Sequence, residues 1–336
     1  MPKLSETTSS ARRPPEGAET SLNPGGPPAG PDEAPGALRP FVVGMVLLYG
    51  LHLALLSYFM PWDRITGEVA ISGFGDFATH INQAALFSEA RTQWGQTWVY
   101  DPSMIAGYPA LTVFDIDNKA WQLFVHMGRQ FGWNIIEGFN GYVVLAHLLV
   151  PAVMAFVSRC FGLRYDATLI AVGLGMGLWW FDSFVHWCWW AGMLAFTFAG
   201  YAFLVPLACF YRYCKAPSWG WAIASGLSLG VLHLMHPFAF FACAVPMLVI
   251  FARKWASFDT VQRGTVFGIA GVVLLMNGWW LANAFAHWDY LVDSSHYGQS
   301  SARFFLADIA SLMLQPETTG MIGTRTGFRF ICWILG

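Results

Sequence analysis

The sequence predicts an all-α polytopic membrane protein with about seven transmembrane helices and a long first outer loop. Of its residues, 56% are hydrophobic and 11% are charged, against roughly 25% charged in an average soluble domain. Apolar segments of nearly bilayer length recur along the chain. Basic residues fall in alternate connections between these segments. Together these observations favour a chain threaded through a bilayer over a soluble core.

The basic residues of the short connections all fall on one side of the predicted bundle. They are Arg159, Arg164, Arg212, Lys215, Arg253, Lys254 and Arg263. The connections around 181–190 and 233–238, on the other side, carry none. Because basic loops remain in the cytoplasm, we expect the amino terminus to be cytoplasmic and the region after Ala286 to lie outside.

Residues 1–40 differ in composition from the rest of the chain. They hold nine of the 18 prolines, with Gly, Ser and Glu and few aliphatic residues, so they bury too little apolar surface to fold. They lack the basic n-region and the cleavage site of a signal peptide. We expect a disordered cytoplasmic tail, followed by a first transmembrane helix at 41–60 that remains as an anchor.

Residues 61–140 are predicted to form the extracytoplasmic loop. No segment of this stretch is both apolar and long enough to span. Residues 76–94 and 118–131 each place apolar side chains at helical spacing, a pattern typical of helices that lie along a membrane surface. We therefore expect two interfacial helices in the loop.

Residues 141–286 supply six further spans, which form the transmembrane bundle. The predicted ranges are 141–160, 167–181, 191–211, 218–234, 238–251 and 265–286. Several are short, which is typical of tilted or closely packed helices. Residues 287–336 are predicted to be a second outer segment, and 330–336 resembles the start of a truncated eighth helix. We expect a fragment or a short relative of a longer protein.

Chemically useful side chains gather on the predicted outer side. Thirteen of the 17 tryptophans map there, whereas an interfacial belt alone would mark both sides. Aromatic faces together with carboxylates and imidazoles are typical of a site that holds sugar rings. The net charge of −2, without a basic patch outside the inner connections, argues against a nucleic-acid partner.

Short motifs in the first outer loop resemble a known family. Asp76 follows Gly75 and precedes His80 by four residues, and Gly107-Tyr108-Pro109 comes later, before an acidic pair and a helix. Further features are His233-Leu-Met-His236-Pro237 and Asn277-Gly-Trp-Trp280. Over about residues 41–300 the pattern is similar to GT-C-type membrane glycosyltransferases, in particular to a poorly characterised bacterial branch. Such enzymes are usually longer and have further spans.

The resemblance implies an inverting glycosyltransferase of the bacterial inner membrane. Its donor would be a sugar linked to polyprenyl phosphate, and its acceptor would bind at the periplasmic face. The phosphate is already a good leaving group, so the protein must mainly position the acceptor hydroxyl and remove its proton. By resemblance Asp76 is that base, and His80, one turn on, orients it or contacts the phosphate. Asp76 is equally suited to be a helix N-cap, and the two roles can coexist.

Further candidates would bind the substrate. Asp115 and Asp117 alternate, so in an extended segment their carboxylates face the same way and could converge on a sugar or, with Asp76, on Mg²⁺ or Mn²⁺. Asp117 could instead cap the following helix. Tyr108 belongs to the Gly107-Tyr108-Pro109 motif, and His236 belongs to the motif at 233–237; both are candidates for substrate binding. His233 and His236 alone are too few ligands to hold zinc. The alternative role for these two histidines is packing at the turn.

A cation on the outer side would meet the phosphate of a lipid donor. The choices are Arg91, Lys119, Arg129 and Arg303. Arg303 lies in the segment 301–306, which has the pattern of an interfacial helix, and it is the preferred phosphate contact. The alternative for this residue is a role in solvent or among lipid headgroups.

Two other functional classes stay open. A non-catalytic membrane subunit or scaffold, with membrane-protein partners, suits a short chain that lacks a donor site. A transporter would place ionisable residues in the middle of its spans. Only His52 and His147 are clear cases, so the sequence favours a transporter less than the other classes. The feature that discriminates them is whether Asp76, His80 and the aspartate pair face one cavity open to lipid.

Overall fold

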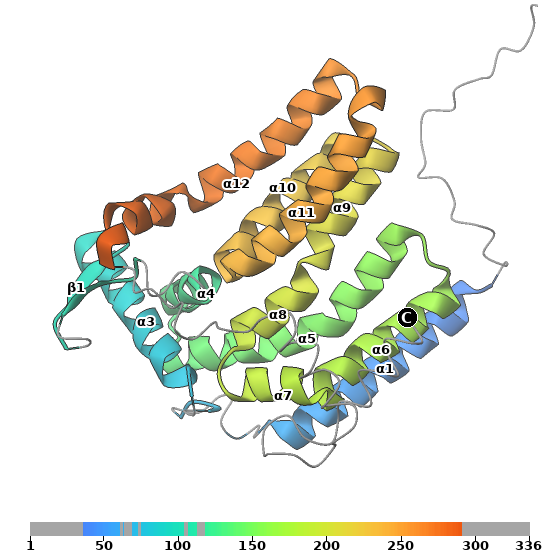
Figure 1. Ribbon diagram of the computed structural model, residues 1–336. Helices are drawn as coiled ribbons and strands as arrows, with labels where there is room; N and C mark the ends of the chain where they lie inside the picture. Colours follow the sequence, from blue (N-terminus) through green and yellow to red (C-terminus); the bar gives the residue numbers. More distant parts are fainter. Residues whose placement is uncertain are drawn as a thin grey trace, which may run out of the picture.

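The computed structural model describes residues 36–290, except 61–62, 64–68, 73–74, 104–106 and 113–117. This part is predominantly helical, with one small hairpin (Figure 1). The hairpin pairs β1 (Val99–Asp101) with β2 (Tyr108–Ala110) in antiparallel fashion, with Tyr100 opposite Pro109. It was not predicted, because each strand has only three residues and so shows no readable alternation.

Five helical stretches are long and apolar enough to cross a membrane, as expected for an all-α membrane protein. They are α1 (Leu38–Phe59), α5 (Ile135–Phe161), α8 with α9 (Leu194–Ala202 and Leu204–Lys215), α11 with its 3-10 turn η2 (Pro237–Lys254 and Trp255–Ser257) and α12 (Thr260–Ala286). The two other predicted spans are α6 (Tyr165–Phe181) and α10 (Trp219–Met235), with 17 residues each. Such a helix rises roughly 25 Å, less than the ~30 Å of a hydrocarbon core.

Two helices begin several residues before their predicted starts because of their capping. At α5 the side chain of Asn134 accepts from the amide of Glu137, and the Glu137 carboxylate accepts from the amide of Asn134, both at 2.8 Å. At α12 the same reciprocal pair joins Asp259 and Gln262. Each box satisfies amides that a helix start leaves without partners.

The predicted span 191–211 is a broken helix preceded by an extra short one. The extra helix is α7 (Ser183–Trp190), and at its start the side chain of Asp182 accepts a hydrogen bond from the amide of Val185 at 2.9 Å. The break falls at Phe203, between α8 and α9. Pro206, in the first turn of α9, has no amide to donate to the preceding turn, so the regular helix is interrupted there.

The segment predicted to be the outer loop contains α3 (Phe77–Glu89), a π-helical turn η1 (Ala90–Trp94) and α4 (Lys119–Gln130). Figure 1 shows α4 nearly end-on, across the direction of the long helices. The indole of Trp121 stacks on the rings of Phe139 and Tyr142 in α5, with centroids 4.6 and 4.9 Å away. Aromatic packing therefore fixes the loop helices on the bundle.

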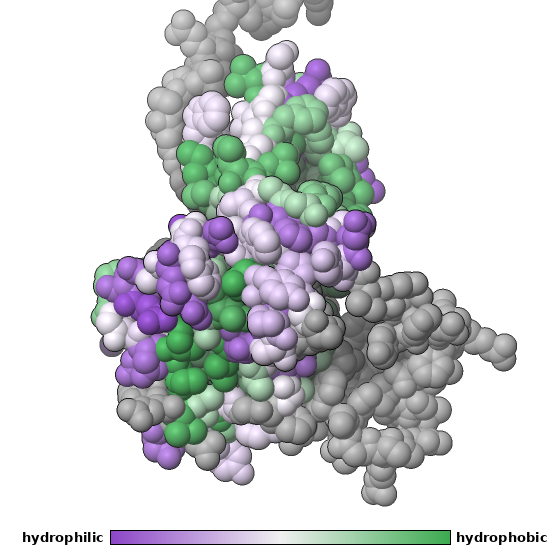
Figure 2. Space-filling model, turned by 90° about the vertical axis from the view of Figure 1, so that its left-hand side faces the viewer, coloured by the Kyte–Doolittle hydropathy of each residue, from purple (hydrophilic) through white to green (hydrophobic). Residues whose placement is uncertain are grey.

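The bundle has two chemically different ends. The start of α1 and the α5–α6, α9–α10 and α11–α12 connections lie along one side of the bundle, from the right to the top in Figure 1. The hairpin, α3, α7 and the end of α12 lie at the opposite end. The first carries the seven basic residues of the short connections and is called the basic end; the other is called the loop end. Figure 2 shows hydrophilic side chains gathered in the middle of the loop-end face, below an apolar area.

Candidate functional site

Asp76 stands at the start of α3, at the loop end, with an exposed side chain. Its backbone is already helical, and its side chain makes no capping hydrogen bond. The capping role that the sequence left open is thus not seen. Within the described residues, the carboxylate has no hydrogen-bond or ion-pair partner. It is therefore available to a substrate.

Two glycines fix the backbone at Asp76. Gly75 has φ 61° and Gly192 has φ 100°, conformations that favour glycine. The Asp76 amide donates a hydrogen bond to the carbonyl oxygen of Ala191 at 2.8 Å. A Cβ atom at Gly75 would collide with that same carbonyl oxygen, and one at Gly192 would lie 2.5 Å from the amide nitrogen of Phe77. The start of α3 is therefore held backbone to backbone against the turn after α7.

His80 lies one turn further along α3, but its imidazole points into the interior. The side chain is 9% exposed. Its Nδ1 lies 2.9 Å from the side-chain nitrogen Nδ2 of Asn118 and 3.2 Å from Oε1 of Gln83, and its ring contacts that of Trp121. The Asp76 carboxylate is exposed, whereas the His80 imidazole is buried. In this structure His80 therefore does not orient the Asp76 carboxylate.

Lys119, the first residue of α4, is completely buried. Its Nζ donates hydrogen bonds to the carbonyl oxygen of Leu111 at 2.8 Å and to Oε1 of Gln122 at 3.3 Å. The buried Nε2 of Gln122 has no hydrogen-bond partner within the described residues. A buried ammonium group is costly unless polar groups surround it. We call His80, Gln83, Asn118, Lys119 and Gln122 the buried polar cluster.

Sequence reasoning missed the two glutamines of this cluster. Both occupy positions that the helical period assigns to the packed face: Gln83 lies between the buried His80 and Phe87, and Gln122 precedes the buried Val125 by one turn. A polar side chain at a core position is the signal that identifies them. Of the other cations predicted to lie on the outer side, Arg91 and Arg129 are exposed, so Lys119 is distinguished by its burial.

Other predicted site residues lie elsewhere. Tyr108, in β2, packs in a small apolar cluster with Phe87 and Leu111. His236 lies between α10 and α11, where its ring contacts Phe196 and Phe238 at 5.3 and 5.6 Å. Asp115, Asp117 and Arg303 lie outside the described residues. Within the part that the structure describes, no three His, Cys, Asp or Glu side chains are grouped to hold a metal ion.

The two histidines predicted to lie within the bundle meet at the contact of α1, α5 and α6. His52 donates from Nε2 to the carbonyl oxygen of His147 at 2.8 Å and accepts from Nε1 of Trp180 at 3.0 Å. His147 donates from Nδ1 to Val143 at 2.7 Å, while its Nε2 has no partner among the described residues. His52 is thus fully satisfied as a neutral imidazole, and His147 is satisfied on one side.

His126, on α4, is predicted to titrate below its usual range. Partial burial lowers its pKa, and the guanidinium groups of Arg91 and Arg129 lower the pKa further. As the pH falls below about 6.5, the unfolded chain therefore binds this proton before the folded chain does, and the free energy of unfolding decreases. Arg91→Gln should raise the pKa of His126 in an NMR titration of labelled imidazoles. Arg253→Gln, at the basic end, should leave it unchanged; equal shifts would contradict the assignment.

Comparison with known proteins identified no relative: no protein-family model, no curated protein and no solved structure matches this chain.

Proposed function

We propose that this chain is a membrane glycosyltransferase that moves a sugar from a lipid-phosphate donor to an acceptor hydroxyl at the loop end. The observation that supports the proposal most is the state of the Asp76 side chain. Its carboxylate is exposed and is not used for capping, while its backbone is fixed by the contact with Ala191. A carboxylate of this kind can act as a general base because its oxygens are not engaged and its position is defined.

The proposed chemistry is a single displacement with inversion. The acceptor oxygen attacks the anomeric carbon of the donor sugar. The bond from that carbon to the phosphate oxygen breaks, and the phosphate leaves with the electron pair. The acceptor proton passes to Asp76. The buried polar cluster has a supporting role, because its hydrogen bonds between α3 and α4 keep the base on a rigid support.

A transfer assay with the purified full chain tests this function. The chain is reconstituted in a bilayer and offered a panel of polyprenyl-phosphate sugars with candidate acceptors. The expected result is transfer from at least one donor. If the folded chain transfers nothing from any donor, the non-catalytic subunit is the better description.

For the topology, we propose seven spans, with the basic end in the cytoplasm of a bacterial inner membrane. α6 and α10 join the five longer spans because each packs along two of them: α6 contacts α1 and α5, and α10 contacts α9 and α12. Basic residues at one end of all these helices favour that end as the cytoplasmic one. The loop end, with Asp76, would then face the periplasm.

Cysteine labelling checks this orientation. Gln96 at the loop end and Ser257 at the basic end are both exposed, so each can carry an introduced cysteine. In intact cells an impermeant maleimide should label Gln96→Cys, whereas Ser257→Cys should react only after permeabilisation. The described native cysteines are buried, and Cys332 is replaced in both variants. The reverse labelling pattern would show that the chain has the opposite orientation and that Asp76 does not face the periplasm.

A further inference from the structure

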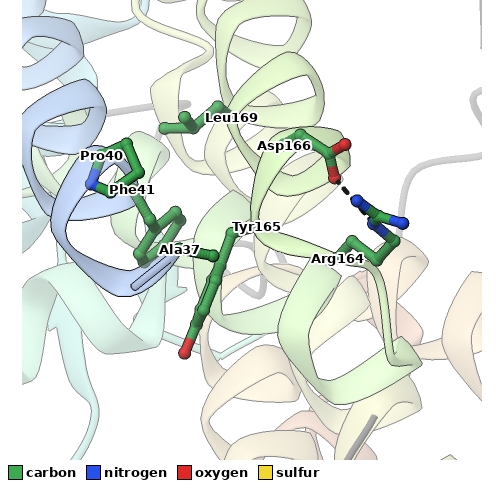
Figure 3. A pocket seen from close by; sticks show the side chains of 7 residues that line it. All are labelled: Ala37, Pro40, Phe41, Arg164, Tyr165, Asp166 and Leu169. Carbon is green, nitrogen blue, oxygen red and sulfur yellow. Dashed lines mark ion pairs between the residues drawn. The ribbon is translucent and has the colours of Figure 1, made fainter. Parts of the chain in front are cut away.

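The basic end contains a pocket between α1 and α6 that has no part in the proposed transfer. Its volume is about 180 Å³. Its lining residues are Ala37, Pro40, Phe41, Arg164, Tyr165, Asp166 and Leu169 (Figure 3). The rings of Phe41 and Tyr165 stack with centroids 4.6 Å apart. The guanidinium group of Arg159 lies 4.2 Å from the Tyr165 ring centroid. The pocket thus has aromatic walls beneath a charged rim.

The rim carries a guanidinium group that is only partly used. Nε of Arg164 lies 3.4 Å from Oδ1 of Asp166, drawn as the dashed contact in Figure 3. The two Nη atoms of Arg164 make no other hydrogen bond among the described residues. Asp166 is also engaged by the amide of Ala167 at 2.9 Å. Arg159 lies over the ring of Tyr165, and Arg39 precedes the lining residue Pro40 in the sequence. Three cations and one carboxylate therefore belong to the segments that form the pocket, which gives these segments a net positive charge.

An apolar depression on α1 adjoins the pocket at Phe41. It has a volume of about 520 Å³ and begins at Phe41, which it shares with the pocket. It is lined by Phe41, Val42, Met45, Val46, Tyr49, Gly50 and Leu53. From Phe41 to Leu53 the helix advances roughly 18 Å, more than half of a ~30 Å hydrocarbon core. A pocket with a charged rim therefore adjoins an apolar surface that runs along α1, and Phe41 belongs to both.

We propose that the pocket between α1 and α6 binds the phosphate of an anionic phospholipid, with one acyl chain along the depression on α1. The Nη atoms of Arg164 supply the paired donors that a phosphate diester accepts. Basic segments at a membrane surface attract anionic lipids. A second copy of this chain is a poorer occupant, because a symmetric contact would bring the same cations face to face. The lipid is distinct from the sugar donor, which binds at the opposite end.

Lipid titration of the purified full chain, followed by native mass spectrometry, tests the headgroup contact. With phosphatidylglycerol as the probe, Arg164→Gln should weaken binding about fivefold, the effect of one cation near the surface. Asp166→Asn should strengthen binding, since it removes the competing carboxylate. Arg263→Gln is the matched control, because its guanidinium group lies at the same end but is held by the carbonyl oxygen of Trp255 at 2.9 Å.

Tail binding is tested on the same helix. Met45→Trp fills the depression and should weaken phosphatidylglycerol binding, whereas Leu47→Trp, at a residue that is 69% exposed and outside the depression, should not. Unchanged affinity in Arg164→Gln would overturn the proposal, as would equal competition by phosphatidylcholine. Competition by soluble glycerol 3-phosphate would show that the pocket binds a free phosphate compound and not a lipid. A change of oligomeric state in Met45→Trp would show that the depression on α1 contacts a second copy of this chain and not a lipid.

Discussion

Asp76→Asn is expected to abolish sugar transfer, lowering kcat by about a hundredfold or more, the typical contribution of a positioned general base. The amide has nearly the same shape as the carboxylate but cannot accept the acceptor's proton at neutral pH. Because the Asp76 carboxylate makes no hydrogen bond to the described residues, the substitution should leave the thermal unfolding temperature in detergent unchanged. Rate and stability thus separate a catalytic role from a structural one.

The control for this variant is Glu89→Gln. Glu89 ends the same helix, is exposed, and accepts a hydrogen bond from Gln93, so it reports the loss of a carboxylate from α3 away from the proposed base. It should transfer sugar at the wild-type rate. Transfer by Asp76→Asn at a rate close to that of the wild type would show that the base is another residue.

Gly192→Ala should destabilise the protein by about 2–5 kcal/mol. A left-handed conformation costs an L-residue roughly 1–2 kcal/mol, and overpacking adds about 1–3 kcal/mol. Here the added Cβ would lie 2.5 Å from the amide nitrogen of Phe77 and 2.9 Å from that of Asp76. If the turn moves away to relieve the overlap, Asp76 moves too, and the transfer rate should also fall.

Gly132→Ala is the matched control for the contact itself. Gly132 has φ 89°, but a Cβ atom there would meet nothing within 4 Å. This variant should therefore show the conformational cost alone, roughly 1–2 kcal/mol. Denaturant unfolding of both variants in detergent gives the difference. Equal losses would mean that the backbone contact between α3 and the turn after α7 contributes nothing.

Much of the helical layout was predictable because hydrophobic period and length act locally. The start of α10 at Trp219 lies one residue from its prediction, and α6 ends at the predicted Phe181. The starts of α5 and α12 were placed too late because capping boxes at Asn134 and Asp259 extend each helix beyond its apolar stretch. α7 was missed because residues 181–190 were interpreted as a connection between two spans.

The candidate site was less predictable because its contacts join distant segments. The motif spacing placed Asp76 and His80 on one helical face. It could not show that the imidazole turns toward Asn118, 38 residues away, while the carboxylate remains exposed. Nor does any local pattern indicate that Lys119 is enclosed by the carbonyl of Leu111 and by Gln122. These arrangements depend on how α3 and α4 pack together, which the sequence does not state directly.

The backbone hydrogen bond from Asp76 to Ala191 has a consequence for biosynthesis. α3 and α4 can dock as soon as α5 has emerged from the ribosome, since Phe139 and Tyr142 supply their platform. The turn at Ala191 and Gly192 emerges only after α6 and α7. A nascent chain that ends at Phe181 would therefore carry docked loop helices whose first turn still has no backbone partner. The proposed base would acquire its final position only after α7 has emerged.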